Sequence, residues 1–137
     1  MVKKIINVEN ISVLSSLRQK HTILKNISLS ILNKDIVGLI GETGSGKSIF
    51  AKLLMGLLPN GCCVNHGNIF YDFDDGIENI LEIRGKKISL VSQDPAQSLN
   101  PLYTIGKQFG MILSKRYNYH NEKIKEKTVE WLFKVGL

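Results

Sequence analysis

One run of eight residues constrains this chain more than any other feature: "GETGSGKS", residues 41 to 48. The preceding segment "IVGLI", residues 36 to 40, is apolar at nearly every position, which predicts a strand buried on both faces of a parallel sheet. After the run, apolar residues recur at helical spacing at Phe50, Leu53, Leu54 and Leu57. Pro59 and Gly61 then stop the helix. The sequence therefore predicts a strand, a glycine-rich turn and a helix that follow one another without a gap.

The residue types of this turn suit the phosphates of a nucleotide, because they fit the pattern of a glycine, four free positions and Gly-Lys-Ser. Gly44 and Gly46 tolerate the tight backbone conformations that turn successive N–H groups toward one point. The helix that follows presents its positive end to the same phosphates. Lys47 supplies a charge for the β- and γ-phosphates, and the Ser48 hydroxyl suits Mg²⁺. The predicted nucleotide-binding residues are Gly41, Glu42, Thr43, Gly44, Ser45, Gly46, Lys47, Ser48 and Ile49.

The segments around this turn have the pattern of strands. From residue 3 to residue 31, β-branched residues mix or alternate with polar ones, which predicts an antiparallel sheet with one solvated face. "NKD" at residues 33 to 35 is a turn signal. Beyond the helix the expected elements are a loop over residues 59 to 67, a strand over 67 to 73, a turn at 74 to 76 and a buried strand over 87 to 92.

The last part of the chain has the period of helices. A first helix is predicted from its apolar face of Ile105, Phe109, Ile112 and Leu113. A second is predicted from Ile124, Thr128, Trp131, Leu132 and Val135. Gly136 lies where a residue that ends a helix belongs. The change of pattern near Asn100 and Pro101 is the only boundary that the sequence suggests.

Composition and residue spacing exclude several classes of protein. The apolar runs are far shorter than the roughly 18 to 20 residues of a membrane span, and polar residues interrupt the N-terminal stretch before a signal peptide forms, so we expect a cytoplasmic chain. The adjacent Cys62 and Cys63 are expected to be reduced thiols in a loop. With His66 they fall short of the four ligands of a structural zinc site.

The formal net charge of +6 raises the question of nucleic-acid binding. The lysines between residues 115 and 134, however, are interleaved with Glu122, Glu126 and Glu130, which is typical of a solvated helix face. We therefore expect no nucleic-acid partner. A basic surface facing anionic lipid or an acidic partner is the less favoured alternative.

The stretch "ISLVSQDPAQSLNPLYTIGKQ", residues 88 to 108, separates the classes of nucleotide-binding protein. It places Gln93 at the end of a predicted buried strand, beside the phosphate site, where its amide suits Mg²⁺ or a water molecule. Together with "GETGSGKS", the words "QDP", "SLNP" and "TIGKQ" resemble the ATP-binding cassette family, and within it the ATPases of peptide and nickel import systems. "LKNISLSI", "GLLPNG" and "KVGL" resemble the same subfamily in place and order.

The resemblance implies an α/β fold, namely a P-loop NTPase core of the ABC type that is incomplete. Residues 1–100 would form an N-terminal antiparallel β-subdomain and the first part of the nucleotide-binding core, and residues 101–137 the start of the helical subdomain. It also implies ATP and Mg²⁺ as cofactors. Gly41 to Ser48 correspond to the Walker A loop, in which Ser48 is a ligand of Mg²⁺. Gln93 corresponds to the Q-loop glutamine, which contacts either the same Mg²⁺ or the attacking water.

The implied partners are membrane permease subunits, a second ATP-binding subunit in a head-to-tail dimer and, indirectly, an extracytoplasmic substrate-binding protein. The implied location is the cytoplasmic face of the membrane. The implied function is the ATP-binding subunit of an importer that couples ATP binding and hydrolysis to uptake of small peptides or nickel.

Two departures from the family pattern shape the expected activity. Ser15 stands where many members stack the adenine on an aromatic residue. The 137 residues also contain no Ser-Gly-Gly signature, no strand ending in Asp-Glu and no switch histidine in context, so the chain resembles the N-terminal part of a cassette. The alternative function is therefore a truncated remnant that binds MgATP without hydrolysing it. A kinase or GTPase is disfavoured, since the chain has no Asn-Lys-x-Asp motif.

Overall fold

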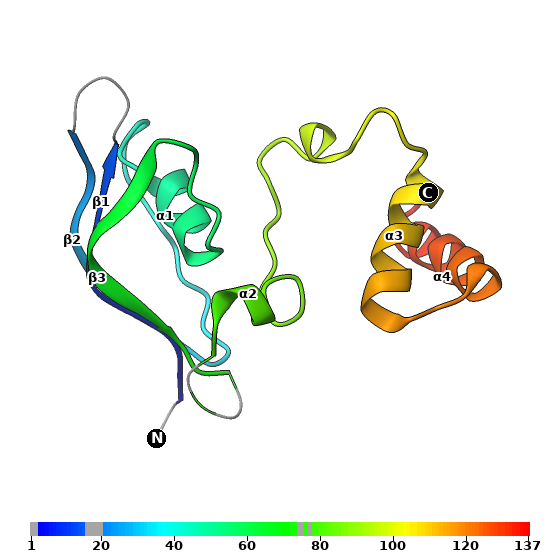
Figure 1. Ribbon diagram of the computed structural model, residues 1–137, viewed down its shortest axis with the longest axis horizontal. Helices are drawn as coiled ribbons and strands as arrows, with labels where there is room; N and C mark the ends of the chain where they lie inside the picture. Colours follow the sequence, from blue (N-terminus) through cyan, green and yellow to red (C-terminus); the bar gives the residue numbers. More distant parts are fainter. Residues whose placement is uncertain (1–2, 16–20, 74–75, 77) are drawn as a thin grey trace. The chain divides into compact units, whose positions relative to one another are not determined.

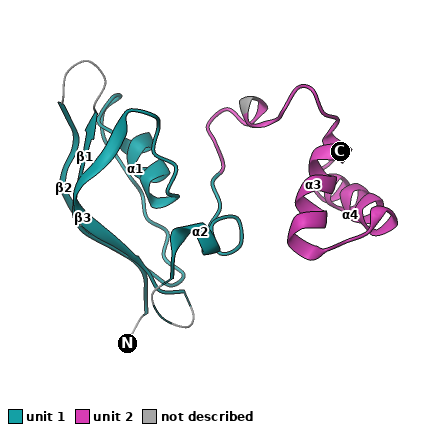
Figure 2. Ribbon diagram, viewed as in Figure 1, with its two compact units in different colours: residues 1–90 teal, residues 91–137 magenta. Residues whose placement is uncertain are grey.

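The computed structural model describes residues 3–15, 21–73, 76 and 78–137. They form two compact units, residues 1–90 and residues 91–137, which are coloured separately in Figure 2. This boundary between compact units differs in kind from the predicted boundary near residue 100, which separates two subdomains of the ATP-binding cassette. The predicted subdomain boundary stays a prediction.

The first unit is built on a three-stranded antiparallel sheet with the strand order β2-β1-β3 (Figure 1). Its strands are β1 (Lys4–Ser15), β2 (His21–Leu32) and β3 (Cys62–Tyr71). The antiparallel sheet predicted for residues 3 to 31 is confirmed where the structure describes the chain. The predicted loop over residues 59 to 67 is wrong from Cys62 onward, because residues 62–66 pair with β1. Of the predicted turn at 74 to 76, residues 74 and 75 lie outside the described residues.

A β-bulge in β1 keeps its apolar residues on one face. Val8 and Ile11 are three residues apart, yet both are 1% exposed in the core. The register shifts between them against both neighbouring strands, and Asn10 adopts a φ of 49°. Across from the bulge, Gly67 has a φ of +90°, and a Cβ there would lie 2.4 Å from the carbonyl oxygen of Glu9. Only glycine fits opposite this bulge.

One helix of this unit, α1 (Lys47–Leu54), packs against the sheet, and the shorter α2 (Ile80–Ile83) adds one residue to the same core (Figure 1). Phe50 and Leu53 are the buried residues of α1. They belong to one apolar cluster with Ile6, Val8, Ile11, Val13, Leu24, Tyr71 and Ile83. The helical spacing predicted after the phosphate loop is confirmed for Phe50, Leu53 and Leu54, but α1 ends at Leu54, and the predicted face residue Leu57 lies beyond it and is exposed.

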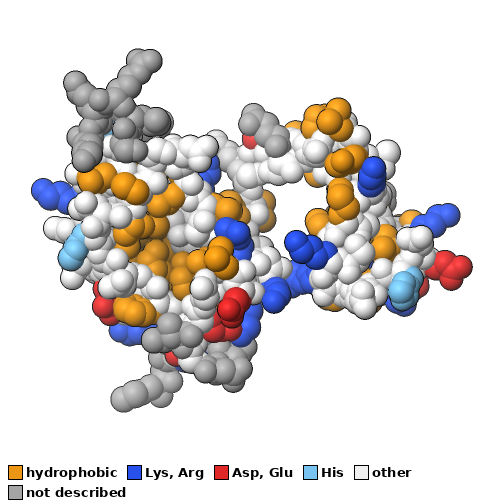
Figure 3. All heavy atoms as spheres, in the orientation of Figure 1, with side chains coloured by type: hydrophobic (Ala, Val, Ile, Leu, Met, Phe, Trp, Pro, Cys, Tyr) orange, Lys and Arg blue, Asp and Glu red, His pale blue; other side chains and the backbone are white. Residues whose placement is uncertain are grey.

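Two predicted buried strands do not form. Residues 36 to 40 have no strand structure, and Ile36 and Ile40 are 101% and 95% exposed. Residues 89 to 92 are equally irregular, and Val91 is 88% exposed. A central parallel strand needs neighbours that take up its N–H and C=O groups, and among the described residues no strand pairs with either segment. Figure 3 shows hydrophobic side chains gathered on the visible face of the first unit.

The second unit is a helical hairpin, with a short 3₁₀ turn (Ala96–Ser98) before α3 (Ile105–Tyr117) and α4 (Asn121–Lys134). Leu113 is fully buried, and the rings of Phe109 and Trp131 meet edge to face with centroids 6.0 Å apart. Gly136 ends α4 in a Schellman turn with a φ of +85°, in which Leu137 N donates to Leu132 O at 3.0 Å. Both helices and the role of Gly136 are confirmed.

The charges of α4 pair along its surface, as the interleaved sequence predicts. Glu130 accepts hydrogen bonds from Lys127 Nζ at 2.5 Å and from Lys134 Nζ at 2.6 Å. These two hydrogen bonds lower the pKa of Glu130 from 4.5 to about 2. Lys123 pairs with Glu126 at 3.2 Å in the same way.

Candidate functional site

The predicted phosphate loop enters α1 through two left-handed residues. Gly44 has a φ of +86° and Gly46 a φ of +93°. A side chain at Gly44 would meet no atom within 4 Å, so the backbone angle alone favours glycine there. Gly46 has a second constraint, since a Cβ would lie 2.7 Å from Leu24 Cδ2. The expected need for glycine at these two positions is confirmed.

The floor of the loop is Leu24 of β2, a residue that sequence reasoning did not select. It is 6% exposed and belongs to the sheet core. A Cβ on Gly46 would lie 2.7 Å from its Cδ2, so the start of α1 passes close to β2 at this residue. The sequence signal was only its alternation within an apolar strand, which marks a core residue and does not identify what it supports.

The side chain of Lys47 is hydrogen-bonded to the backbone of the loop. Its Nζ donates hydrogen bonds to the carbonyl oxygens of Gly41 at 2.7 Å and Glu42 at 2.6 Å. Ser45 Oγ lies 3.4 Å from the same nitrogen. The ammonium group is therefore held over the loop, next to the amino end of α1. An anion seated in the loop would meet a full positive charge there.

The amino end of α1 has the properties of an anion site. Its first N–H groups have no acceptor within the helix, no described side chain caps it, and its first turn contains no acidic residue. Asn79 caps α2 and Thr104 caps α3, whereas α4 also starts without a side-chain cap hydrogen bond but has Glu122 in its first turn. The positive end of the α1 dipole is thus left for a ligand.

The other predicted loop residues occupy the same turn. Glu42 and Thr43 are exposed, and Ser45 N donates to Glu42 O at 3.2 Å. Ser48 is an exposed residue of the first turn of α1, whereas Ile49 packs against the core cluster. The structure thus brings together the nine residues from Gly41 to Ile49 in one loop and helix start.

Gln93 belongs to the second unit, within a tight turn. It is exposed, and no strand precedes it, which corrects the predicted position at a strand end. The neighbouring Ser92 Oγ donates to Asp94 O at 3.1 Å and lies 2.6 Å from Ser98 Oγ. These serine contacts close the turn locally and leave the Gln93 amide on its surface.

The two motifs that follow this turn, "SLNP" and "TIGKQ", are joined by hydrogen bonds. The side-chain amide of Gln108 accepts from Asn100 N at 3.0 Å and donates to the carbonyl oxygens of Asn100 at 3.1 Å and Tyr103 at 2.9 Å. Asn100 Oδ1 in turn accepts from Leu102 N at 2.9 Å. "SLNP" and "TIGKQ" are therefore a loop and the helix that fastens it, a link the sequence did not reveal.

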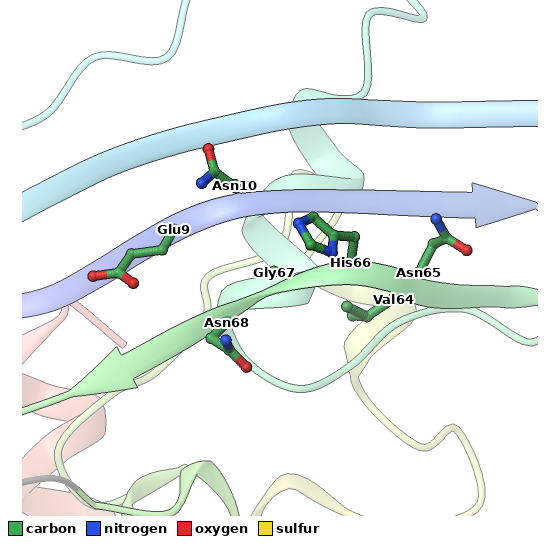
Figure 4. A pocket seen from close by; sticks show the side chains of 7 residues that line it. All are labelled: Glu9, Asn10, Val64, Asn65, His66, Gly67 and Asn68. Atoms are coloured by element: carbon green, nitrogen blue, oxygen red, sulfur yellow. The ribbon is translucent and has the colours of Figure 1, made fainter.

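A hollow lies at the β-bulge of the sheet (Figure 4). Its lining is mostly polar and comprises Glu9, Asn10, Val64, Asn65, His66, Gly67 and Asn68. Within residues 3–15, 21–73, 76 and 78–137, no group of three His, Cys, Asp or Glu side chains suits a metal ion. The hollow follows from the bulge geometry.

Cys62 and Cys63 are free thiols, as predicted, although they lie in a strand.

No helix in the described part of the chain has both the length and the apolar content needed to span a bilayer.

Comparison with known proteins finds similarity to one family. A family model described as "ABC transporter" matches residues 24–137. The oligopeptide transport ATP-binding protein AmiE of Streptococcus pneumoniae is 32% identical over 121 residues, which are 85% of this chain and 34% of that protein. The probable D,D-dipeptide transport ATP-binding protein DdpD of Escherichia coli is 35% identical over 114 residues, covering 80% of this chain and 35% of that protein.

A third relative points the same way. The oligopeptide transport ATP-binding protein AppD of Bacillus subtilis is 36% identical over 115 residues, which are 80% of this chain and 35% of that protein. The chain spans about a third of the length of these curated relatives.

Proposed function

This chain belongs to the ABC transporter family, and on that premise we propose that it is the ATP-binding portion of an importer subunit that couples ATP binding and hydrolysis to uptake of short peptides. The names of its relatives refer to oligopeptide and D,D-dipeptide transport, which supports peptides as the cargo. Nickel, the other cargo suggested by the sequence, stays a prediction.

The single observation that carries the proposal is the loop from Gly41 to Lys47 at the uncapped start of α1. Its left-handed glycines, the uncapped first turn of α1 and the Lys47 ammonium lie close together in the chain and would suit one anion. A triphosphate would take over hydrogen bonds that the ammonium now makes to Gly41 O and Glu42 O. The loop thus fits the β- and γ-phosphates of a nucleotide.

Magnesium would be held by oxygen ligands next to these phosphates. The exposed Ser48 hydroxyl follows Lys47 directly, and oxygen is the donor type that Mg²⁺ prefers. Gln93 belongs to residues 91–137, and its role as a second ligand of the ion stays a prediction from the sequence. When bound, the ion supplies charge neutralisation for the phosphates.

The proposed setting is a peripheral complex at the cytoplasmic face of the membrane. The helical residues 101–137 would contact the permease subunits, and a second ATP-binding subunit would complete a head-to-tail dimer. A substrate-binding protein would act on this chain only through the permease. These partners rest on family membership and on the resemblance of the motif words.

A titration with a series of nucleotides tests the proposal. We expect the purified chain to bind MgATP about 10 to 100 times more tightly than AMP, since each charge-assisted contact to the terminal phosphates contributes about 1.5 to 3 kcal/mol. Calorimetry with ATP, ADP, AMP and tripolyphosphate measures the difference. Equal affinity for ATP and AMP would show that the loop does not hold the phosphates.

The alternative function, binding without turnover, calls for a separate measurement. The 137 residues lack the signature and the Asp-Glu strand end, so we propose that the isolated chain holds MgATP without hydrolysing it. We expect phosphate release at the rate of buffer alone. Release above that rate, abolished by Gln93→Ala, would instead show a complete hydrolytic site in this chain.

A further inference from the structure

The carboxyl end of α1, opposite the phosphate loop, has hydrogen-bond donors for its last carbonyl groups. Lys52 O accepts from Leu57 N at 2.8 Å, and Leu53 O accepts from Gly56 N at 2.9 Å. Gly56 has a φ of +63°, so these bonds form a Schellman turn. The turn leaves the carbonyl groups of residues 54 to 56 for donors outside the helix.

Two side chains from other elements supply those donors. Tyr71 Oη, in β3, donates to Leu54 O at 2.8 Å. Arg84 Nη1, directly after α2, lies 3.4 Å from Met55 O and 3.3 Å from Gly56 O. Every carbonyl oxygen from residue 52 to residue 56 therefore has a donor.

These two side chains differ in what they contribute. Tyr71 is 5% exposed, and burial raises the pKa of its hydroxyl, so the group remains a protonated donor at neutral pH. It fixes the helix end to the sheet. Arg84 places a positive charge at the negative end of the helix dipole. Ile80 lies close to the same turn, since a Cβ on Gly56 would lie 3.2 Å from its Cγ2.

We propose that Tyr71 and Arg84 are positioning residues for the phosphate loop. An eight-residue helix is a rigid rod about 12 Å long, so a tie at one end determines where the other end lies. Hydrogen bonds from its first amides to a phosphate tolerate only a few tenths of an ångström. With the carboxyl end held, the amino end is already in place when a nucleotide arrives, and less ordering is needed on binding. This role rests on the nucleotide binding proposed above.

The test compares variants that remove each donor while keeping the bulk of the side chain. Tyr71→Phe and Arg84→Met remove the donors, and Arg84→Lys retains the charge. Tyr103→Phe and Arg116→Met, in the second unit, are matched controls. We expect the Kd for MgATP to rise about threefold in Tyr71→Phe and about fivefold in Arg84→Met, because the helix start must then be ordered when the nucleotide binds. Arg84→Lys should recover part of the loss, and both controls should bind like the parent.

All titrations use the whole chain at a temperature where far-UV circular dichroism shows each variant fully folded. A purely structural role would lower the unfolding temperature of Tyr71→Phe and Arg84→Met and leave the Kd of the folded protein unchanged, which would overturn the positioning role. Failure of the parent itself to bind MgATP would overturn the proposed function first. Tyr71→Phe, which loses a single oxygen, decides the matter if Arg84→Met does not fold.

Discussion

Replacing Lys47 with alanine is expected to raise the Kd for MgATP about 10- to 100-fold. The Lys47 ammonium is the full positive charge held over the loop by Gly41 O and Glu42 O. Hydrogen bonds to charged groups contribute about 1.5 to 3 kcal/mol, and 1.4 kcal/mol corresponds to a factor of ten. Calorimetric titration of parent and variant with MgATP measures the change.

Lys52→Ala is the matched control for this experiment. It removes the same charge from the same helix, at an exposed position in the last turn, away from the loop. We expect its Kd to stay within about twofold of the parent, because screened surface charges act weakly at this range. If Lys47→Ala bound MgATP as tightly as Lys52→Ala, the loop would not be the nucleotide site.

The second large effect concerns the free energy of unfolding, which we expect to respond very differently to alanine substitution of two isoleucines. Ile11→Ala should lower the free energy of unfolding by about 2 to 5 kcal/mol, because the side chain is 1% exposed and its loss leaves a cavity under α1. Ile36→Ala should change it by less than about 0.5 kcal/mol, because Ile36 is 101% exposed. Urea unfolding followed by circular dichroism measures both values.

This pair decides between the observed fold and the strand that the sequence predicts. A strand buried on both faces over residues 36 to 40 would make Ile36→Ala nearly as costly as Ile11→Ala. Ile40→Ala, at a residue that is 95% exposed, repeats the comparison independently. Large losses at both exposed positions would show that the segment is packed.

Local patterns predicted much of this structure because the causes were local. The antiparallel sheet, the helix after the loop, the two C-terminal helices and the Gly136 turn all follow from alternation, helical spacing or a backbone angle that favours glycine. The same holds for the phosphate loop, where Gly44 and Gly46 adopt positive φ angles. At these positions the residue type and its backbone need agree.

The errors arose where structure depends on distant partners. Residues 36 to 40 and 87 to 92 have the composition of buried strands, but composition cannot supply the neighbour that a parallel strand requires. The bulge at Asn10 was also missed, since its backbone depends on contacts with both adjacent strands. Leu24, Tyr71 and Arg84 carried no motif, and only the folded chain reveals that they surround α1.

The bulge in β1 has a consequence for the nucleotide loop itself. Side chains along a strand alternate in parity, and one extra residue reverses that parity for everything beyond it. Val13, beyond the bulge, pairs with Leu24, which in turn supports Gly46. Removing one residue at the bulge would move the side chains of this part of the strand to the opposite face of the sheet. The phase of the sheet under the phosphate loop thus depends on Glu9 and Asn10, two exposed residues of the bulge, together with the further register shift between Ile11 and Val13.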